Sequence, residues 1–201
     1  VGARNLAVQA QAIGAKLIHL STDDVFSHHA RQPYNEFEIP TPSTIYGKSK
    51  LAGERFVQNL CTRHVIVRSS WVYGIGRDFV NTILEAANNP SVTSMEVAEN
   101  EFASPTSATE LAKVIEQLID NDCLGIYHAV CGGFCSRFEF AQAILKAIHA
   151  EDQLTLKPTS NSEDTNYSVL DNMMLRLEDF AQPVSWQQAL KDYITTTGGN
   201  N

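Results

Sequence analysis

Short apolar segments rich in β-branched residues alternate with helical segments, and this alternation is the feature that most constrains the fold. The segments KLIHLST (16–22), HVIVRSSWVYG (64–74) and GIYHAV (125–130) are predicted to be buried strands. Strands that are apolar on both faces and joined by helices are typical of parallel, doubly wound sheets. We therefore predict an α/β fold, with a partial Rossmann-like doubly wound parallel sheet and a smaller α/β lobe.

The helices are predicted from their apolar spacing and their capping residues. Gly14 suits the left-handed end of the first helix. Serine followed three residues later by Glu or Gln predicts capping boxes at three helix starts: Ser107 with Glu110, Ser136 with Glu139, and Ser185 with Gln188. The expected helices cover about 1–13, 44–60, 77–88, 108–121, 138–150 and 186–194, with smaller extended pieces at 92–98, 154–158 and 167–170.

Composition and charge argue against several classes of partner. The 201 residues include 15 basic and 23 acidic side chains, for a net charge of −8. Because the chain is acidic and has no Lys/Arg cluster, nucleic acid and anionic membranes are poor candidate partners. No apolar run approaches the roughly 18 residues that a membrane span requires. We expect a cytoplasmic protein with neither a nucleic-acid nor a membrane partner.

The cysteines and the paired histidines do not predict a metal site. Cys131 and Cys135 are four residues apart, but no second pair with zinc-type spacing accompanies them. We predict four reduced, half-buried thiols, as is usual in the cytoplasm. His28 and His29 lie in a polar loop, where we expect both to be exposed, and no metal is assigned to them.

The segment STIYGKSKLAGERF (43–56) contains a tyrosine and a lysine four residues apart at the start of a predicted helix. Residues i and i+4 share one helix face, so the ammonium of Lys50 can lie near the phenol of Tyr46. A nearby cation lowers the pKa of a phenol from about 10. Such a pair suits protonation of the oxygen that becomes negative when a carbonyl accepts hydride. Alone, Y-x-x-x-K is a weak motif, and a solvated helix face explains it more simply.

Hydroxyl side chains end the first predicted strand. Ser21 and Thr22, followed by Asp23, lie at the carboxyl end of a parallel strand, where open α/β sheets bind ligands. A hydroxyl there can hold a carbonyl beside Tyr46. The second strand ends near Trp71, whose ring suits a sugar or a nicotinamide. Strand termination and core packing explain each of these residues when it is taken singly.

Six motifs, in this order, resemble the extended short-chain dehydrogenases/reductases, and among them the dTDP-4-dehydrorhamnose reductase branch. They are STDDVF, IPTPSTIYGKSKLAGE, IVRSSWVYG, NEFASPTSATELA, GIYHAVCGGFCSRFEFA and YSVLDN, and the resemblance covers about residues 1–194. It implies an oxidoreductase that reduces the 4-keto group of a dTDP-sugar, dTDP-4-dehydro-L-rhamnose, with NADPH or NADH. The product, dTDP-L-rhamnose, is a precursor of cell-surface polysaccharide.

The resemblance also implies roles for individual residues. Tyr46 matches the catalytic acid, and Lys50 matches the residue that lowers its pKa and binds the nicotinamide ribose. The implied catalytic residues are Thr22, Tyr46 and Lys50. The implied cofactor-binding residues are Ser21, Tyr46, Lys50, Ser69, Ser70 and Val72. The implied substrate-binding residues are Thr22, Asp23, Trp71, Phe102, Ser104, Pro105 and Thr106.

The resemblance implies a division of the chain. We expect residues 1–100 to be the C-terminal half of the NAD(P)-binding Rossmann-like domain. Residues 101–194 are expected to form mainly the substrate-binding lobe, with a late return to the cofactor domain, and residues 195–201 a disordered tail. The family's G-x-x-G-x-x-G turn, whose amides hold the pyrophosphate, is not found in this sequence. We therefore expect the chain, if truncated, to bind a dinucleotide poorly by itself and to expose an apolar sheet edge.

Several positions depart from the family pattern. Asp24 replaces a usual tyrosine, Ala103 a usual glycine, and Arg137 a frequent aromatic residue. Thr165 and Asn166 stand where the family tends to carry an arginine–proline pair that helps to hold the diphosphate. These departures leave two alternatives open: a non-catalytic subunit, like the regulatory subunit of methionine adenosyltransferase, and a nucleotide-sugar enzyme with a different sugar. The choice between NADPH and NADH, binding of Mg²⁺ and formation of a homodimer also stay open.

Overall fold

A three-stranded parallel sheet is the centre of the first of two lobes. The computed structural model describes residues 1–160 and 165–197. The strand order is β1-β2-β7, with β1 at Leu17–Thr22, β2 at His64–Ser69 and β7 at Gly125–His128. Both pairings are parallel, which confirms the predicted fold class. β1 is an edge of this sheet, and its Leu20 is 47% exposed.

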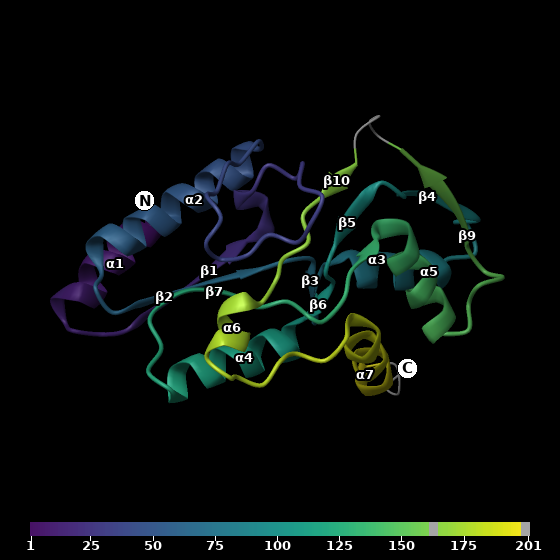
Figure 1. The fold of residues 1–201 in the computed structure, drawn as a ribbon. Helices are drawn as coiled ribbons and strands as arrows, with labels where there is room; N and C mark the ends of the chain where they lie inside the picture. Colours follow the sequence, from purple (N-terminus) through teal and green to yellow (C-terminus); the bar gives the residue numbers. More distant parts are fainter. Residues whose placement is uncertain (161–164, 198–201) are drawn as a thin grey trace.

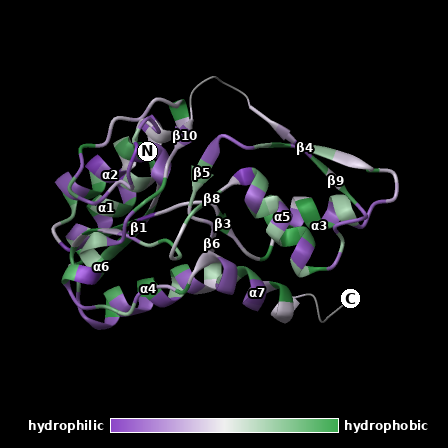
Figure 2. Cartoon of the chain, turned by 45° about the vertical axis from the view of Figure 1, so that its right-hand side comes forward, coloured by the Kyte–Doolittle hydropathy of each residue, from purple (hydrophilic) through white to green (hydrophobic). Residues whose placement is uncertain are grey.

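Helices cover both faces of this sheet (Figure 1). α1 (Gly2–Ala12) and α2 (Ile45–Leu60) pack on one face, and α4 (Ala108–Asp120) and α6 (Met173–Leu177) lie on the other. Successive residues of β2 alternate between the two cores, since Ile66 packs beneath α1 and α2 while Val65 and Val67 pack beneath α4. Figure 2 shows polar and apolar residues mixed along α1, α2 and α4, as expected for helices with one covered face.

The second lobe has a core of its own. It contains α3 (Phe79–Ala87), α5 (Arg137–Ala147) and α7 (Trp186–Thr197), together with the parallel pair β4 (Ser94–Ala98) and β9 (Thr155–Thr159). Val80, Ile83, Phe140 and Ile144 are buried in this core. The predicted boundary at residue 100 does not separate the lobes, because α3 and β4 precede it and yet pack with α5 and β9.

Short strands join the two lobes (Figure 1). β3 (Val72–Tyr73) pairs with β6 (Thr106–Ser107), and β5 (Glu101–Ala103) lies between β10 (Asn166–Tyr167) and β8 (Cys135–Ser136). The prediction of one strand over 64–74 is wrong. Trp71 has a φ of 40°, in the left-handed region, so the extended backbone breaks between β2 and β3.

The helix ends follow most of the predicted signals. Gly14 has a φ of 68°, and Ser136 and Glu139 form both hydrogen bonds of a capping box. At Ser107 only one of the two capping-box hydrogen bonds forms, in which the Ser107 hydroxyl accepts from the amide of Glu110. The second does not form, because the Glu110 carboxylate accepts from the amide of Val184 instead. α7 extends to Thr197, three residues beyond its predicted end, while residues 198–201 of the predicted tail lie outside the described residues.

The loop after β1 contains a buried histidine. His28 is 9% exposed, and its Nε2 lies 3.2 Å from Oδ1 of Asp24, whereas His29 is exposed. The prediction of two exposed histidines is therefore wrong for His28, which a short-range ion pair draws inward. All four cysteines are free, and they are buried rather than half-buried as predicted. In the described ranges, no helix combines the length and apolar character needed to cross a bilayer.

Candidate active site

The carboxyl ends of β1 and β2 meet at one edge of the sheet. The strands are parallel and in register, so Thr22 lies opposite Ser69. Asp23 begins a 3-10 turn, η1 (Asp23–Val25), directly after β1, and Ser70 directly follows β2. Hydroxyl and carboxyl groups therefore gather where open α/β sheets bind their ligands, as the sequence predicts.

Asp23 is the centre of a buried hydrogen-bond network. Its Oδ1 accepts from the hydroxyl of Thr22 at 2.9 Å. Its Oδ2 accepts from the hydroxyls of Ser70 at 2.7 Å and Ser168 at 2.6 Å. Burial raises the pKa of this carboxyl, and the three hydroxyls oppose that shift. Asp23 therefore faces the protein interior and orients Thr22, whereas the sequence predicted contact with substrate.

A close contact brings the start of α2 onto η1. Thr44 caps the helix by accepting from the amide of Gly47 at 2.9 Å. A Cβ on Gly47 would lie only 1.9 Å from the carbonyl oxygen of Asp24, so only glycine allows this approach. The approach places Tyr46 beside Thr22, close enough for the Thr22 side chain to influence the phenol. Tyr46 is 54% exposed and therefore accessible to a ligand.

The electrostatics of Tyr46 differ from the sequence-based expectation. Partial burial raises its pKa, the carboxylates of Asp24 and Asp23 raise it further, and the nearby hydroxyl of Thr22 opposes the change. Lys50 donates from Nζ to the carbonyl oxygen of Leu20 at 2.7 Å. The expected lowering of the Tyr46 pKa by Lys50 is thus not found in this arrangement. Tyr46 is protonated at neutral pH, which is the form that an acid catalyst requires.

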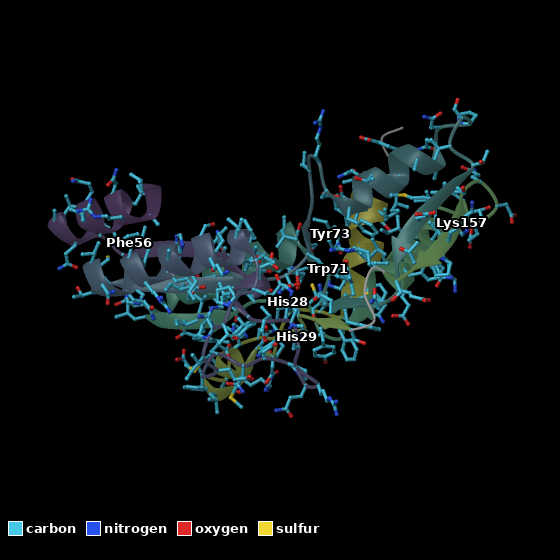
Figure 3. The ribbon with its side chains drawn as sticks, turned by 90° about the horizontal axis from the view of Figure 1, so that it is seen from above. His28, His29, Phe56, Trp71, Tyr73 and Lys157 are labelled. Atoms are coloured by element: carbon cyan, nitrogen blue, oxygen red, sulfur yellow. The ribbon has the colours of Figure 1, made fainter. Side chains whose placement is uncertain are left out.

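Trp71 lies at the junction of the two lobes. Figure 3 shows it near Tyr73 and close to the middle of the molecule, on the side toward His28. The guanidinium carbon of Arg137 is 3.5 Å from the centroid of the Trp71 ring, and the ring also stacks on Phe140 at 6.5 Å. The next residue, Val72, is 45% exposed. Trp71 is therefore held in place by its contacts in the second lobe.

The segment after β5 uses its polar side chains internally. Ser104 donates from its hydroxyl to the carbonyl of Gly133 at 2.7 Å. The hydroxyl of Thr106 donates to the carbonyl of Ser104 at 3.0 Å. Pro105 is also buried. Phe102 keeps partial exposure and packs beside Phe134 and Tyr167 at 6.5 Å each. Of these four predicted substrate contacts, Phe102 has the side chain best placed to reach a ligand.

Among the predicted cofactor-binding serines, two already form internal hydrogen bonds and one does not. The hydroxyl of Ser69 donates to the carbonyl of Ala129, and that of Ser70 donates to Asp23, so both are already engaged. The hydroxyl of Ser21 is buried and finds no hydrogen-bond partner among the residues that the structure describes. This hydroxyl, at the carboxyl end of β1 and next to Thr22 in the chain, is chemically suited to a dinucleotide ribose or nicotinamide amide. No cluster of three or more His, Cys, Asp or Glu side chains suited to a metal ion occurs in residues 1–160 and 165–197.

Two site residues were not singled out from the sequence for a role. Ser168 belongs to the YSVLDN motif, but nothing in that motif indicates that its hydroxyl reaches Asp23. Arg137 was noted only as a departure from an aromatic position. Its neighbours, Trp71 and Glu101, come from other segments of the chain, so the contact is visible only in the folded structure.

A family model for the RmlD substrate binding domain matches residues 1–198. The chain belongs to this family. Among its relatives, the spore coat polysaccharide biosynthesis protein SpsK of Bacillus subtilis is 35% identical over 96% of this chain and 69% of that protein. The dTDP-4-dehydrorhamnose reductase of Escherichia coli is 31% identical over 96% of this chain and 70% of that enzyme. The RmlD-type assignment confirms the resemblance found in the sequence.

Solved structures agree with this RmlD-family membership. The dTDP-4-dehydrorhamnose reductase of Bacillus anthracis, in complex with NADP, superposes with a TM-score of 0.92 and 37% identity, over 98% of this chain and 71% of that chain. A dTDP-glucose 4,6-dehydratase of the same organism has a TM-score of 0.81 at 15% identity and shows the shared fold alone. The family fold is therefore Rossmann-like, as predicted.

Proposed function

We propose that this chain provides the proton donor and the sugar-binding surface of an oxidoreductase that makes dTDP-L-rhamnose. The reaction reduces the 4-keto group of dTDP-4-dehydro-L-rhamnose with NADPH or NADH. The observation that carries the proposal is the placement of Tyr46 beside Thr22 at the carboxyl end of β1, with Lys50 one turn further along α2. The names of the reductase relatives support the same reaction.

The chain's own residues account for the proton transfer. When bound, NADPH or NADH would supply the hydride for C4 of the sugar, and Ser21 and Lys50 would hold the dinucleotide. As negative charge develops on O4, Tyr46 gives its phenolic proton to that oxygen. Lys50 is on the same helix face, but its ammonium bonds the carbonyl oxygen of Leu20, so its proposed part is to hold the dinucleotide and not to lower the pKa of Tyr46. Thr22, whose hydroxyl is fixed by Asp23, lies beside the phenol and would help to position it before the transfer.

The Tyr46→Phe variant of the complete protein tests this role. The phenyl ring keeps its packing but has no proton to give, so we expect turnover to fall by roughly 100-fold or more. Affinity for the dinucleotide should change little. The measurement is NADPH oxidation with the keto-sugar, beside a binding titration of NADPH. Tyr127→Phe is the matched control, because its phenol donates to the carboxylate of Glu178, outside the site.

Unchanged turnover in Tyr46→Phe would remove Tyr46 from the mechanism. Absence of turnover in the wild-type protein, with normal folding, would favour the non-catalytic, regulatory alternative.

Four further properties stay predictions: the preference for NADPH over NADH, Mg²⁺ binding, homodimer formation and a cytoplasmic location. Steady-state rates with each dinucleotide, with and without EDTA, test the first two. Light scattering after size-exclusion chromatography tests the third.

A further inference from the structure

Arg137 is a cation at the junction of the lobes. It is the first residue of α5, directly after Ser136, which pairs with Phe102 across β8 and β5. Its guanidinium carbon lies 3.5 Å from the ring centroid of Trp71 and 4.8 Å from that of Phe79. These aromatic contacts hold the planar guanidinium without using its N–H donors, which remain for other partners.

The guanidinium is poorly neutralised by the protein. Its nearest carboxylate oxygen, Oε2 of Glu101, is 4.0 Å from Nε, which is beyond hydrogen-bond distance. Among residues 1–160 and 165–197, no acceptor forms a hydrogen bond with Arg137 that would use its five N–H donors. Burial lowers the pKa of Arg137, which is the cost of holding this charge away from water. Its side chain keeps 23% exposure, so a ligand can still reach it.

The neighbouring strands place this charge next to the proposed substrate site. Asp23, which orients Thr22, is close enough to act on the charge of Arg137. Glu101 lies opposite Asn166 in the β5–β10 pair. Asn166 and the preceding Thr165 are the polar, uncharged residues found where the resemblance leads us to expect an arginine–proline pair. The cation at this junction is therefore Arg137 of α5, which lies on the other side of β5 from the position where the arginine was expected.

We propose that Arg137 binds phosphate oxygens of the nucleotide-sugar, as a bidentate partner for the diphosphate. A guanidinium fork matches two phosphate oxygens in geometry and charge. Stacking on Trp71 holds the fork before the ligand arrives, and the same contact connects the diphosphate subsite to the ring expected to face the sugar. Arg137 acts here as a specificity-determining residue. The inference rests on the proposed function, since it assumes a nucleoside diphosphate sugar.

Calorimetric titration with dTDP and with thymidine, without dinucleotide or keto-sugar, tests this proposal. Arg137→Met keeps an unbranched side chain over Trp71 but removes the charge. We expect it to weaken dTDP binding by about tenfold or more and to leave thymidine binding unchanged. Glu101→Gln, which removes the competing carboxylate, should bind dTDP at least as tightly as wild type. Unchanged dTDP affinity in Arg137→Met, or equal weakening for dTDP and thymidine, would overturn the proposal.

Arg137→Lys covers the case in which Arg137→Met does not fold. It keeps the charge but not the fork, so weaker dTDP binding supports the bidentate contact and wild-type affinity contradicts it. Failure of the proposed function is distinguishable from failure of this inference. A wild-type protein that does not bind dTDP overturns both. Weakened dTDP binding in Arg137→Met, in a protein without reductase activity, overturns the reductase assignment and supports the Arg137 subsite.

Discussion

Asp23 accepts a hydrogen bond of 2.6 Å from the hydroxyl of Ser168, which lies 145 residues further along the chain. The same carboxylate accepts from Ser70, after β2, and from Thr22, at the end of β1. One buried anion thereby connects three segments at the edge of the sheet. The orientation of Thr22, and with it that of Tyr46, depends on a contact made by the last third of the chain.

Replacing Ser168 with alanine tests that dependence. Asp23 would lose one of the donors that compensate its buried charge, so we expect the free energy of unfolding to fall by about 1–3 kcal/mol. Because Thr22 would be held less firmly, kcat should fall more than KM changes. Urea unfolding and steady-state kinetics measure the two effects. The exposed Ser91→Ala variant is the control, and a Ser168→Ala variant indistinguishable from it would contradict the role of the network.

Gly47→Ala should separate α2 from η1. The added methyl group would lie 1.9 Å from a backbone oxygen of Asp24, which cannot move aside as a flexible side chain can. We expect Tyr46 to be displaced and kcat/KM to fall by about 100-fold, as misplacement of a catalytic group by about 1 Å can cause. Gly53→Ala, on the same helix, is the matched control, since its methyl group meets mainly the side chain of His19 at 3.2 Å. Equal activity in the two variants would show that the close approach is not needed.

The ion pair between His28 and Asp24 should make stability depend on pH. Burial alone would lower the pKa of His28, but the carboxylates of Asp24 and Asp23 outweigh it and raise the pKa above 6.5. A histidine with a raised folded-state pKa contributes stability that is complete below pH 6.5 and is lost as pH rises through the folded value. The free energy of unfolding should therefore fall through this group as the pH rises above 6.5 and passes through the raised folded-state pKa.

His28→Asn isolates the contribution of His28 to that pH dependence. Asparagine tolerates the left-handed φ of 66° at this position, so the backbone should persist. Burial lowers the pKa values of His19 and His128, whose contributions have the opposite sign. The difference between wild type and His28→Asn, measured by chemical denaturation across pH, removes those contributions. The exposed His29→Asn variant should keep the wild-type profile, and a flat difference curve for His28→Asn would contradict the ion pair.

Glu54 and Arg68 form a buried ion pair beneath α2. Arg68 donates from Nε and Nη2 to the two carboxylate oxygens at 3.0 and 2.7 Å, and both residues are at most 1% exposed. Glu54→Gln would leave the guanidinium as an uncompensated buried charge, which costs about 3–5 kcal/mol of stability. Urea unfolding measures the loss. Exposed Glu116→Gln, on α4, should unfold like wild type, and a loss in Glu54→Gln no larger than in this control would contradict the assignment.

Local sequence patterns were sufficient to predict the strand and the helix that carry the site residues. The apolar run before Thr22 and the helix start at Tyr46 are both encoded within a few residues, so their positions and element types could be predicted. The parallel pairing of β1 and β2 followed from apolar strands joined by helices. Because a parallel sheet collects its strand ends at one edge, the closeness of Thr22 and Tyr46 could also be predicted from the fold class.

Side-chain partners were harder to predict, because tertiary contacts decide them. The inward orientation of Asp23 depends on Ser168, and the burial of His28 depends on how its loop folds onto Asp24. The break at Trp71 has no glycine or proline to indicate it in a β-branched run. Lys50 lies on the predicted helix face, but its ammonium bonds a strand carbonyl, so its position was predictable and its partner was not.

The alternation of the chain between its lobes limits how such a protein can be recombined. After β2 the chain enters the second lobe for α3 and β4, returns for α4 and β7, and leaves again for α5 and β9. It comes back through β10 to α6 and ends in the second lobe with α7. A single splice point would therefore leave segments of both lobes in each piece. Transfer of a sugar-binding lobe between two such proteins would need several matched junctions, so changes of specificity are more accessible through point substitutions at the shared edge.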